Sequence, residues 1–351
     1  MTAHGGNTST QQGRTTLAAV ASQAGVSVAT VSKVVNDRSD VSDTTRARVR
    51  HLLDEHGYLP RTSHRRAVNT FPALELAFEG DLHAYTAEVL QGVLDAAAES
   101  GVSVVVTSRP IGAGPAAAEA RRWAHALAAS GRRALIAVTS VLSMSQLSAL
   151  AREGISLVVI DPLEMPKVEV TSVGSTNFSG GVSAVQHLLQ LGHRRIAYLG
   201  GHSSAACNEA RMHGYRAAME RAGVGVPDEL VRSSRFLYTD GVDVGLELLD
   251  LPTPPTAIFA GSDEIAVGVM EAARKRGLDV PADLSIVGFD DTQLARMSSP
   301  PLTTVRQPLA EMGRLAVRTA LRLSNGETVA SHHVELATDL ILRESTAPPA
   351  S

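Results

Sequence analysis

The sequence predicts two kinds of folded unit: a small all-α domain near the start of the chain, and a larger α/β body built on parallel sheets. The zone Thr15–Val68 holds eight Lys and Arg against five Asp and Glu. It therefore contributes +3 to the formal net charge of −4, and the rest of the chain contributes −7. This zone has short helix-period stretches, whereas from Phe71 onward short apolar runs alternate with helix-period stretches. Such alternation is typical of βαβ units and parallel sheets.

Composition excludes several classes of protein. The 351 residues include a single cysteine, Cys207, which excludes an intramolecular disulfide framework and a cysteine-based zinc cluster. No apolar run approaches the roughly 20 residues of a membrane span. Residues Met1–Gln12 lack the apolar core of a signal peptide. We therefore expect a cytoplasmic protein with no membrane partner and a disordered segment at residues 1–14. The basic zone beside an acidic body indicates a nucleic-acid contact at one end.

Residues 15–60 are expected to form three short helices. Their expected ranges are Leu17–Gln23, Val28–Asn36 and Asp43–His56. Gly25 supplies the positive φ that a tight turn between the first two helices requires. Ser27 and Ser42 are placed to cap the second and third helices. A helix, a Gly-containing turn and a second helix form a helix-turn-helix, whose second helix can enter the major groove of DNA.

The same residues resemble the DNA-binding headpiece of the lactose-repressor (LacI/GalR) family. The resemblance rests on the runs Thr16–Asn36 (TLAAVASQAGVSVATVSKVVN), Val41–Arg46 (VSDTTR) and Gly57–Pro60 (GYLP). It implies that Val28, Ala29 and Lys33 face base edges. The lysine can donate to guanine but lacks the planar fork of an arginine. The remaining contacts implied by the resemblance, mostly to phosphates, are Thr16, Ser27, Thr30, Ser32, Asn36 and Tyr58.

Residues 61–70 depart from the family pattern. The resemblance implies a hinge segment here that enters the minor groove, with a leucine wedged between bases. The matching position is Ala67, followed by Val68, and a methyl group unstacks bases less readily than the leucine side chain. Arg61, Arg65 and Arg66 remain suited to phosphates or to a narrow minor groove. Whether Ala67 or Val68 replaces the wedge is left open.

The resemblance continues through the body, residues 71–345. It rests on the runs Gly192–Gly201 (GHRRIAYLGG), Arg211–Tyr215 (RMHGY), Leu284–Asp291 (LSIVGFDD) and Pro300–Pro308 (PPLTTVRQP). It implies the periplasmic-binding-protein-like fold: two Rossmann-like subdomains joined by three crossovers, with an effector bound between them. The expected N-subdomain is about 71–173 and 305–334, the C-subdomain is about 174–304 and 335–345, and residues 346–351 are expected to be a loose tail.

Candidate effector contacts lie where the apolar runs end, because parallel sheets bind ligands beyond the carboxyl ends of their strands. The polar candidates are Asp161, Asn208, Arg211, Ser262, Asp263 and Asp290. The aromatic candidates, Tyr85 and Phe236, align with wall positions of the family. Carboxylates and an arginine suit a ligand with adjacent hydroxyls, and a sugar ring stacks on an aromatic wall. Asp263 is equally suited to cap a helix. Asp291 and His193 are expected to be structural, and His332-His333 lacks a third metal ligand.

These observations predict a sequence-specific transcriptional regulator controlled by a small molecule. We expect a repressor of carbohydrate-utilisation genes that binds a palindromic operator as a homodimer, possibly as a higher oligomer, with a sugar as effector. No catalytic residue, metal or cofactor is expected, because dinucleotide, nucleophile-elbow and phosphate-loop patterns are missing. A purine effector, a sugar-binding module without DNA and a carbohydrate enzyme are the alternatives. Ala205, where a purine-responsive relative carries an arginine, favours a sugar.

Overall fold

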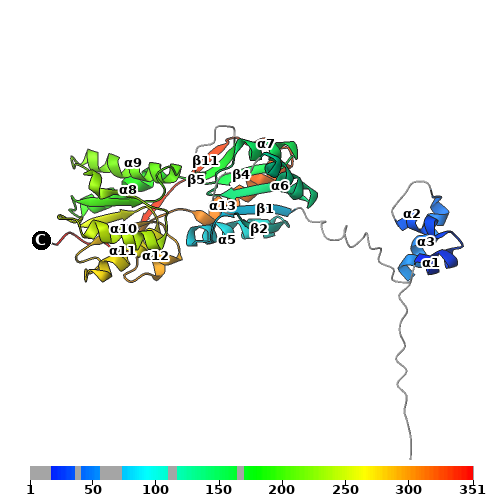
Figure 1. Cartoon of the computed structure of the whole chain (residues 1–351), viewed down its shortest axis with the longest axis horizontal. Coiled ribbons are helices and arrows are strands. Elements are labelled where there is room, and N and C mark those ends of the chain that lie inside the picture. Colours follow the sequence, from blue (N-terminus) through cyan, green and yellow to red (C-terminus); the bar gives the residue numbers. More distant parts are fainter. Residues whose placement is uncertain (1–16, 36–40, 56–72, 110–116, 164–169, 351) are drawn as a thin grey trace, which may run out of the picture. The chain divides into compact units, whose positions relative to one another are not determined.

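The computed structural model describes residues 17–35, 41–55, 73–109, 117–163 and 170–350. By its contacts the chain divides into two compact units, residues 1–70 and 71–351. The helices of the first unit are α1 (Leu17–Ala24), α2 (Val28–Val35) and α3 (Asp43–Glu55), blue in Figure 1. Val20, Val31 and Val49 are fully buried where the three helices meet. One small apolar cluster therefore holds this unit together.

The turn and caps predicted for the first unit are confirmed. Gly25, between α1 and α2, has a φ of +66°, a conformation that glycine adopts without steric cost. Ser27 Oγ accepts a hydrogen bond from the Thr30 N–H at 3.1 Å at the start of α2. Ser42 Oγ accepts one from the Thr45 N–H at 3.4 Å at the start of α3. The helix-turn-helix thus follows from its turn residue and its caps.

The second unit contains two six-stranded sheets. In the first sheet the spatial order is β11 (His333–Leu336), β5 (Thr171–Ser175), β4 (Ser156–Ile160), β3 (Arg132–Val138), β1 (Ala73–Glu79) and β2 (Ser103–Arg109). In the second sheet it is β12 (Asp339–Ile341), β10 (Thr303–Arg306), β9 (Ser285–Asp290), β8 (Ala257–Ala260), β6 (Ile196–Gly200) and β7 (Val231–Ser233). Neighbouring strands are parallel, except that β12 runs antiparallel to β10.

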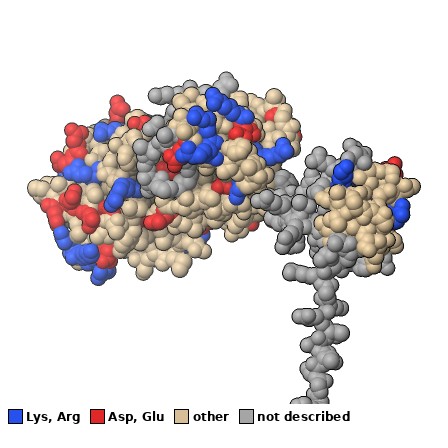
Figure 2. All heavy atoms as spheres, turned by 45° about the vertical axis from the view of Figure 1, so that its right-hand side comes forward, with Lys and Arg blue, Asp and Glu red and all other residues tan. Residues whose placement is uncertain are grey.

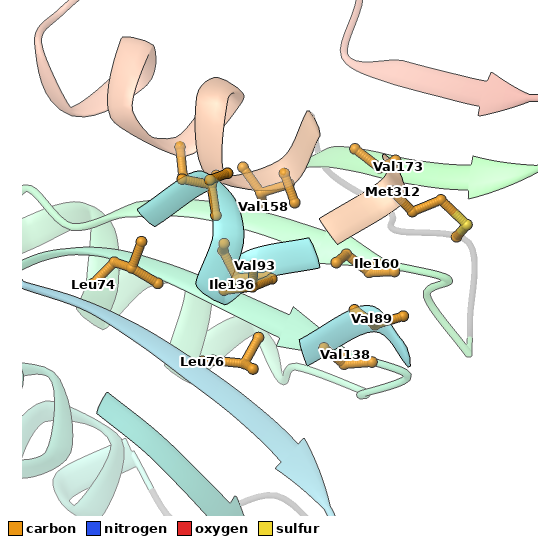
Figure 3. Packing of buried hydrophobic residues seen from close by; sticks show 14 of the residues in the cluster. Leu74, Leu76, Val89, Val93, Ile136, Val138, Val158, Ile160, Val173 and Met312 are labelled. Atoms are coloured by element: carbon orange, nitrogen blue, oxygen red, sulfur yellow. The ribbon is translucent and has the colours of Figure 1, made fainter. Parts of the chain in front are cut away.

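Helices cover both faces of each sheet, as a parallel sheet requires. The first sheet packs α5 (Ala84–Glu99) and α13 (Leu309–Ser324) on one face, and α6 (Ala117–Ala129) and α7 (Met144–Arg152) on the other. The second packs α10 (Tyr238–Leu249) and α11 (Asp263–Lys275) on one face, and α8 (Asn177–Gln190) and α9 (Ala206–Arg221) on the other. Shorter helices are α12 (Gln293–Met297) and η1 (Asp228–Leu230). Figure 3 shows Leu76, Val93 and Ile136 within the first of these cores.

The chain passes between the two sheets three times. It leaves the first sheet after Ser175, returns after Arg306 and leaves again after Leu336. Helix α13, orange in Figure 1, therefore packs on the first sheet although it follows a strand of the second. The expected changeovers near residues 173, 304 and 334 fall inside strands, because each strand continues for two more residues before the chain crosses. These three crossovers join the two subdomains.

The surface of the second unit carries charges of both signs. On the face seen in Figure 2, Asp and Glu are interspersed with Lys and Arg over the core. The acidic balance of this part of the chain is thus not gathered into a single negative patch on that face. Among the described helices, none combines the length and the apolar character that a membrane span needs.

The expectation of a loose tail at residues 346–351 is wrong for Thr346 and Ala347, which continue a hydrogen-bonded segment that begins at Ser345. Ser345 is fully buried, and its carbonyl accepts a hydrogen bond from the Ile286 N–H at 2.8 Å. The Ala347 N–H donates to Ser285 Oγ at 3.0 Å. His193 Nε2 lies 2.9 Å from the Ala347 carbonyl, and its Nδ1 lies 2.9 Å from Thr256 Oγ1. The segment binds through backbone groups and through the hydroxyls of Ser345 and Thr346, and its composition does not reveal these partners. The structural role expected of His193 is confirmed.

Acid is expected to destabilise this tail contact. Because a carbonyl only accepts, Nε2 of the neutral His193 ring donates to Ala347, and Nδ1 accepts from Thr256. Burial lowers the pKa of His193 below its ordinary value of 6.5. Below about pH 6.5 the unfolded chain therefore binds a proton at this residue more readily than the folded chain does. The contribution of neutral His193 to the free energy of unfolding is complete above about pH 6.5 and falls as the pH drops below that value. Thermal unfolding between pH 8 and pH 5.5 measures this loss.

The matched variants are His193→Gln and His125→Gln. The side chain of His125 is three-quarters exposed, so its replacement should leave the pH dependence of the unfolding temperature unchanged. His193→Gln should lower the unfolding temperature at pH 8 and flatten its fall toward pH 5.5. An equally steep fall in His193→Gln and in the unsubstituted protein would contradict the assignment.

Candidate DNA-binding surface and effector cleft

Helix α2 presents an exposed face formed by residues that the sequence analysis singled out. The side chain of Val28 is 47% exposed, and Ala29 and Lys33 are also exposed. Thr30 and Ser32 are half-buried, while the intervening Val31 and Val34 are buried in the core. The hydroxyls of Ser27 and Thr30 lie 2.9 Å apart at the exposed start of the helix. This face carries both apolar and donor groups, which is the surface that major-groove reading requires.

Several predicted DNA contacts fall outside the part of the chain that the structure describes. They are Thr16, Asn36, Tyr58, Arg61, Arg65, Arg66 and Ala67. Their proposed roles rest on the sequence pattern alone. The same holds for residues 1–14 and 61–70 as separate segments.

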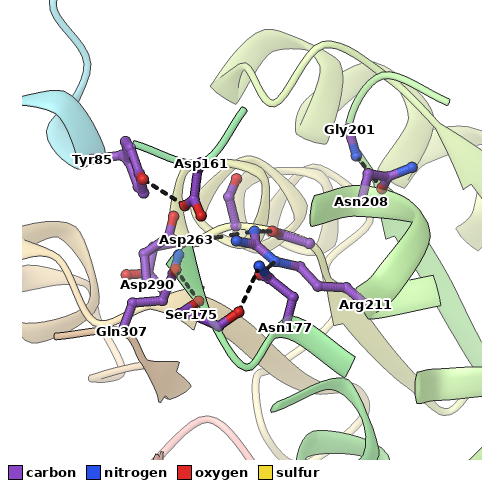
Figure 4. Close-up of polar contacts among 12 residues, drawn as sticks. Tyr85, Asp161, Ser175, Asn177, Gly201, Asn208, Arg211, Asp263, Asp290 and Gln307 are labelled. Carbon is purple, nitrogen blue, oxygen red and sulfur yellow. Dashed lines mark hydrogen bonds and ion pairs between the residues drawn. The ribbon is translucent and has the colours of Figure 1, made fainter. Parts of the chain in front are cut away.

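In the second unit, the predicted carboxylates lie at the carboxyl ends of strands. Asp161 follows β4, and Asp290 is the last residue of β9. Asp161 accepts a hydrogen bond from the Tyr85 hydroxyl of α5 at 2.6 Å (Figure 4). Of the five described non-glycine residues with positive φ, three are cleft candidates: Asp161 (+44°), Phe236 (+66°) and Asp290 (+114°). Such backbone costs of order 1–3 kcal/mol each and clusters at functional sites, because surrounding structure must hold it.

Arg211 connects the residues of the second subdomain with the first crossover. Its Nε donates to Asn177 Oδ1 at 2.8 Å, and its Nη1 donates to the Gly261 carbonyl at 2.6 Å. Its Nη1 also lies 3.8 Å from Asp290 Oδ1. The guanidinium lies 3.8 Å from the centre of the Phe289 ring, a distance suited to a cation–π contact. Arg211 is only 3% exposed, so its orientation is fixed before any ligand arrives.

Burial disfavours the charged form of both cleft carboxylates, Asp161 and Asp290. It raises the pKa of Asp161, against the lowering effects of the Tyr85 hydrogen bond and the Arg211 charge. It also raises the pKa of Asp290 well above the usual value, against Arg211, while the charge of Asp263 adds to the rise. A ligand hydroxyl that donated to either carboxylate would stabilise its charged form. The site therefore favours donors such as hydroxyl groups.

The Phe236 ring packs against Gly201, a residue without a side chain. A Cβ built at Gly201 would lie 1.8 Å from the Phe236 ring, so the ring packs directly against this glycine. The Phe236 ring centre is also 6.0 Å from the guanidinium carbon of Arg211. Phe236 thus lies beside Arg211 at the end of the second sheet, as its assignment as an aromatic wall requires.

Three predicted ligand contacts have their side-chain oxygens bound by other protein groups. Ser262 Oγ accepts from the Ile265 N–H at 3.2 Å, so Ser262, and not Asp263, caps α11. Asp263 is fully buried and accepts from Thr292 N–H at 2.7 Å and from Thr304 Oγ1 at 2.5 Å. Asn208 Oδ1 accepts from the Tyr198 hydroxyl and from the Gly201 N–H. The structure therefore gives Ser262, Asp263 and Asn208 structural partners.

Two further residues of this network were missed by the sequence analysis. Gln307, on the second crossover, donates from its amide nitrogen to Asp290 Oδ1 at 2.6 Å. Its amide oxygen accepts from Ser175 Oγ at 2.5 Å, where β5 ends and the first crossover begins. Gln307 thus ties Asp290 to two crossovers at once (Figure 4). The strand-end rule would have found Ser175 if Thr171–Ser175 had been recognised as a strand.

The structure gives protein partners to Asp291, His332 and His333. Asp291 is structural, as predicted, because its carboxylate pairs with Arg306 at 2.7 Å and with Arg343. The side chains of His332 and His333 lie within hydrogen-bond distance of Thr171 and Ser172. Within the described ranges, no group of His, Cys, Asp and Glu is arranged to hold a metal ion.

A pocket of about 580 Å³ adjoins the network. It shares Asp161, Ser175 and Asn177 with the residues of Figure 4. Its other walls come from β11 and from the first turns of α8 and α9. Strand ends, crossovers and helix starts of both subdomains thus meet around one cavity, where open α/β sheets bind ligands.

Comparison with known proteins decides the family. Residues 16–61 match the model of the bacterial regulatory proteins of the lacI family, and residues 185–346 match a periplasmic binding protein-like domain. The HTH-type transcriptional regulator DegA of Bacillus subtilis is 35% identical over 95% of this chain and 99% of its own length. The chain belongs to the lacI family. Similar lacI-family proteins are transcriptional regulators, and this protein is a DNA-binding regulator, not an enzyme.

Solved structures of other family members share the whole architecture. A complex of the transcriptional regulator CelR with cellobiose matches with a TM-score of 0.71 and 31% identity, over 95% of this chain and all of that chain. A lac repressor dimer bound to operator and to the anti-inducer ONPF matches with a TM-score of 0.71 and 29% identity over the same shares. The predicted fold, a helix-turn-helix headpiece with a two-subdomain core, is thereby confirmed.

Proposed function

We propose that this lacI-family protein is a repressor of carbohydrate-utilisation genes whose binding to DNA is controlled by a sugar. It acts in the cytoplasm, on the nucleoid, as a homodimer on a palindromic operator, because a twofold protein reads a twofold site. Its described DNA contacts are Ser27, Val28, Ala29, Thr30, Ser32 and Lys33. Its effector contacts are Tyr85, Asp161, Arg211, Phe236 and Asp290. Ser262, Asp263 and Asn208 stabilise the cleft through their hydrogen bonds to other protein groups.

The observation that carries the proposal is that carboxylates at strand ends of both subdomains lie within the electrostatic reach of the buried Arg211 of α9. Tyr85 and Asp161 belong to the first subdomain, and Arg211 and Asp290 belong to the second. Together they offer acceptors, fork-shaped donors and an aromatic wall to a compact polar ligand. A sugar has adjacent hydroxyls that both donate and accept, and an apolar ring face that stacks. Similarity to the CelR–cellobiose complex supports the same class of ligand.

A sugar can control DNA binding only if its affinity differs between two arrangements of the core. In the present arrangement, two further contacts join the subdomains. Arg296 of α12 lies 3.2 Å from Glu88 of α5, and His83 lies 3.4 Å from Glu264 of α11. A ligand gripped by both subdomains would shift how far they close. We propose that this shift reaches the headpiece through the hinge segment, residues 61–70.

The direct test is operator binding measured with and without effectors. An operator is first selected from a random duplex library with the full-length protein. Fluorescence anisotropy then follows binding while sugars or purine bases are added. We expect at least one sugar to change operator affinity tenfold or more and purines to have no effect. Release by a purine alone would contradict the sugar assignment, and failure to select any duplex would contradict specific DNA binding.

Replacing Lys33 with alanine is expected to weaken binding to the selected operator by roughly 1–3 kcal/mol, because the protein loses a hydrogen-bond donor to a base edge. The loss should be confined to one base position in a panel of operators with single changes. Arg48, exposed on α3, provides the matched control: Arg48→Ala should affect all sequences equally or not at all. A uniform loss for Lys33→Ala would show that Lys33 contacts the phosphate backbone instead.

A further inference from the structure

The pocket beside the effector network is larger than one compact polar ligand requires. Its volume of about 580 Å³ lies within the roughly 300–1,000 Å³ typical of pockets for drug-sized ligands. Tyr85, Arg211, Phe236 and Asp290 do not line it, whereas Asp161, Ser175 and Asn177 belong to both groups. The network described above therefore adjoins this pocket, here called the side pocket, and shares three residues with it.

The walls of the side pocket mix donors with acceptors. Helices α8 and α9 both begin there, and neither N-cap residue, Thr176 or Ala205, gives its helix a side-chain cap. First-turn N–H groups at such helix starts can donate to a ligand. One of them is already occupied, because the Ala206 N–H donates to the Leu163 carbonyl at 2.9 Å. The carboxylates among the lining residues are Asp161, Glu209 and Glu335, and the imidazoles are His213 and His333. Three carboxylates disfavour an anion, whereas hydroxyl groups can satisfy both kinds of partner.

One wall of the side pocket is an exposed aromatic ring. Phe178, in the first turn of α8, lines the pocket and is 48% exposed. The other described phenylalanines are buried or half-buried. An aromatic face of this kind offers a stacking surface for the apolar face of a sugar ring. The side pocket thus has the same combination of groups as the effector network: an aromatic wall with carboxylates and amide donors.

From this arrangement we propose that the effector is an oligosaccharide of at least two rings. One ring binds the Tyr85–Asp161–Arg211–Asp290 network, and the next binds in the side pocket against Phe178. Asp161, Ser175 and Asn177 connect the network with the side pocket, because they belong to the first and line the second. The inference rests on the proposed sugar effector and specifies its size. The ligand is neutral, since an anionic sugar would face Glu209 and Glu335.

Titration calorimetry on the full-length protein tests the proposal. The probes are matched pairs: glucose with cellobiose and maltose, galactose with lactose, mannose with mannobiose, and xylose with xylobiose. We expect one disaccharide to bind at least about tenfold more tightly than its monosaccharide. Phe178→Ala should lower the affinity for that disaccharide about tenfold, as loss of a stacking surface implies, and change monosaccharide affinity less than twofold.

The control is Met144→Ala, which removes a large side chain, 57% exposed, from the start of another helix. It should leave both affinities unchanged, and thermal unfolding should show that both variants fold. If each monosaccharide binds as tightly as its disaccharides and Phe178→Ala has no effect, the side pocket is not a sugar subsite, although the sugar effector stands. If no sugar of the panel binds, the proposed effector class and this inference are both overturned.

Discussion

Replacing Arg211 with alanine is expected to abolish the response to the effector while operator binding persists. The Arg211 side chain holds Asn177, the Gly261 carbonyl and Asp290 in one buried cluster. Without Arg211, Asp290 loses the only cation that the described residues of this cluster provide. The hydrogen bond from Arg211 to Asn177 at the first crossover is lost as well. A lost bidentate or charge-assisted contact to a ligand costs at least tenfold in affinity, and here the site itself is also disorganised.

The measurement is operator anisotropy with the sugar that releases the unsubstituted protein. Arg211→Ala could also destabilise the core, because truncating one partner of a buried pair is costly. Arg211→Lys therefore accompanies it: the charge is kept, while the planar fork that reaches both Asn177 and Gly261 is lost. We expect Arg211→Lys to fold, to bind operator normally and to need at least about tenfold more sugar. Normal induction in both variants would overturn the cleft assignment.

The sequence predicts those parts of the site whose residues lie next to a recognisable strand. Asp161 and Asp290 were found because the runs before them are apolar and buried on both sides, as interior parallel strands are. Strands β5 and β10 could not be predicted from apolar runs, because Thr171–Ser175 and Thr303–Arg306 are rich in Ser and Thr. Their hydroxyls are buried and hydrogen-bonded to side chains that are distant in sequence, such as Gln307 and Asp263. Ser175 and Gln307 lie where the chain crosses after these strands, so the link between the Asp290 carboxylate and the two crossovers could not be predicted.

The limits of pattern reading also show at Asp263 and at the C-terminus. A carboxylate at a helix start predicts a cap or a ligand contact equally well, and only the structure shows that Thr292 and Thr304 occupy it. The tail contact depends on the carbonyl and hydroxyl of Ser345 and on the backbone of Ala347, whose partners the composition of the tail does not specify. Side-chain chemistry at strand ends is local and can be predicted, whereas partners that are distant in sequence cannot.

A charged pair inside the first sheet was likewise hidden within an apolar run. Glu75 lies in the middle of β1 and is 4% exposed. Its Oε1 accepts from Thr107 Oγ1 at 2.8 Å, and its Oε2 lies 2.6 Å from Arg132 Nε at the start of β3. The register between β1 and β3 shifts at this point: Ala73 pairs with Arg132, but Leu74 pairs with Ala134. We infer that the ion pair holds this irregular register at the first strand of the core.

Removing either partner of this pair alone is expected to be strongly destabilising. Glu75→Leu leaves Arg132 without its carboxylate in the sheet, Arg132→Met leaves Glu75 without its cation, and breaking a buried pair costs about 3–5 kcal/mol. Because the Arg132 side chain is 21% exposed, water can partly solvate its charge once the carboxylate is gone. The expected loss in the free energy of unfolding is therefore at the lower end of this range, about 3 kcal/mol. The double variant Glu75→Leu with Arg132→Met replaces both charges by apolar groups and should lie within about 1 kcal/mol of the unsubstituted protein.

Urea unfolding of the full-length protein, followed by circular dichroism, measures these differences as a double-mutant cycle. The cycle isolates the pair, because losses at independent sites add and losses at coupled sites do not. We expect the double variant to be more stable than either single variant, with a coupling of at least about 2 kcal/mol. Additive losses would show that Glu75 and Arg132 act separately. In that case the β1–β3 register would be held by the surrounding apolar contacts of Ala77 and Leu135, which pack in one cluster on the same face of the sheet.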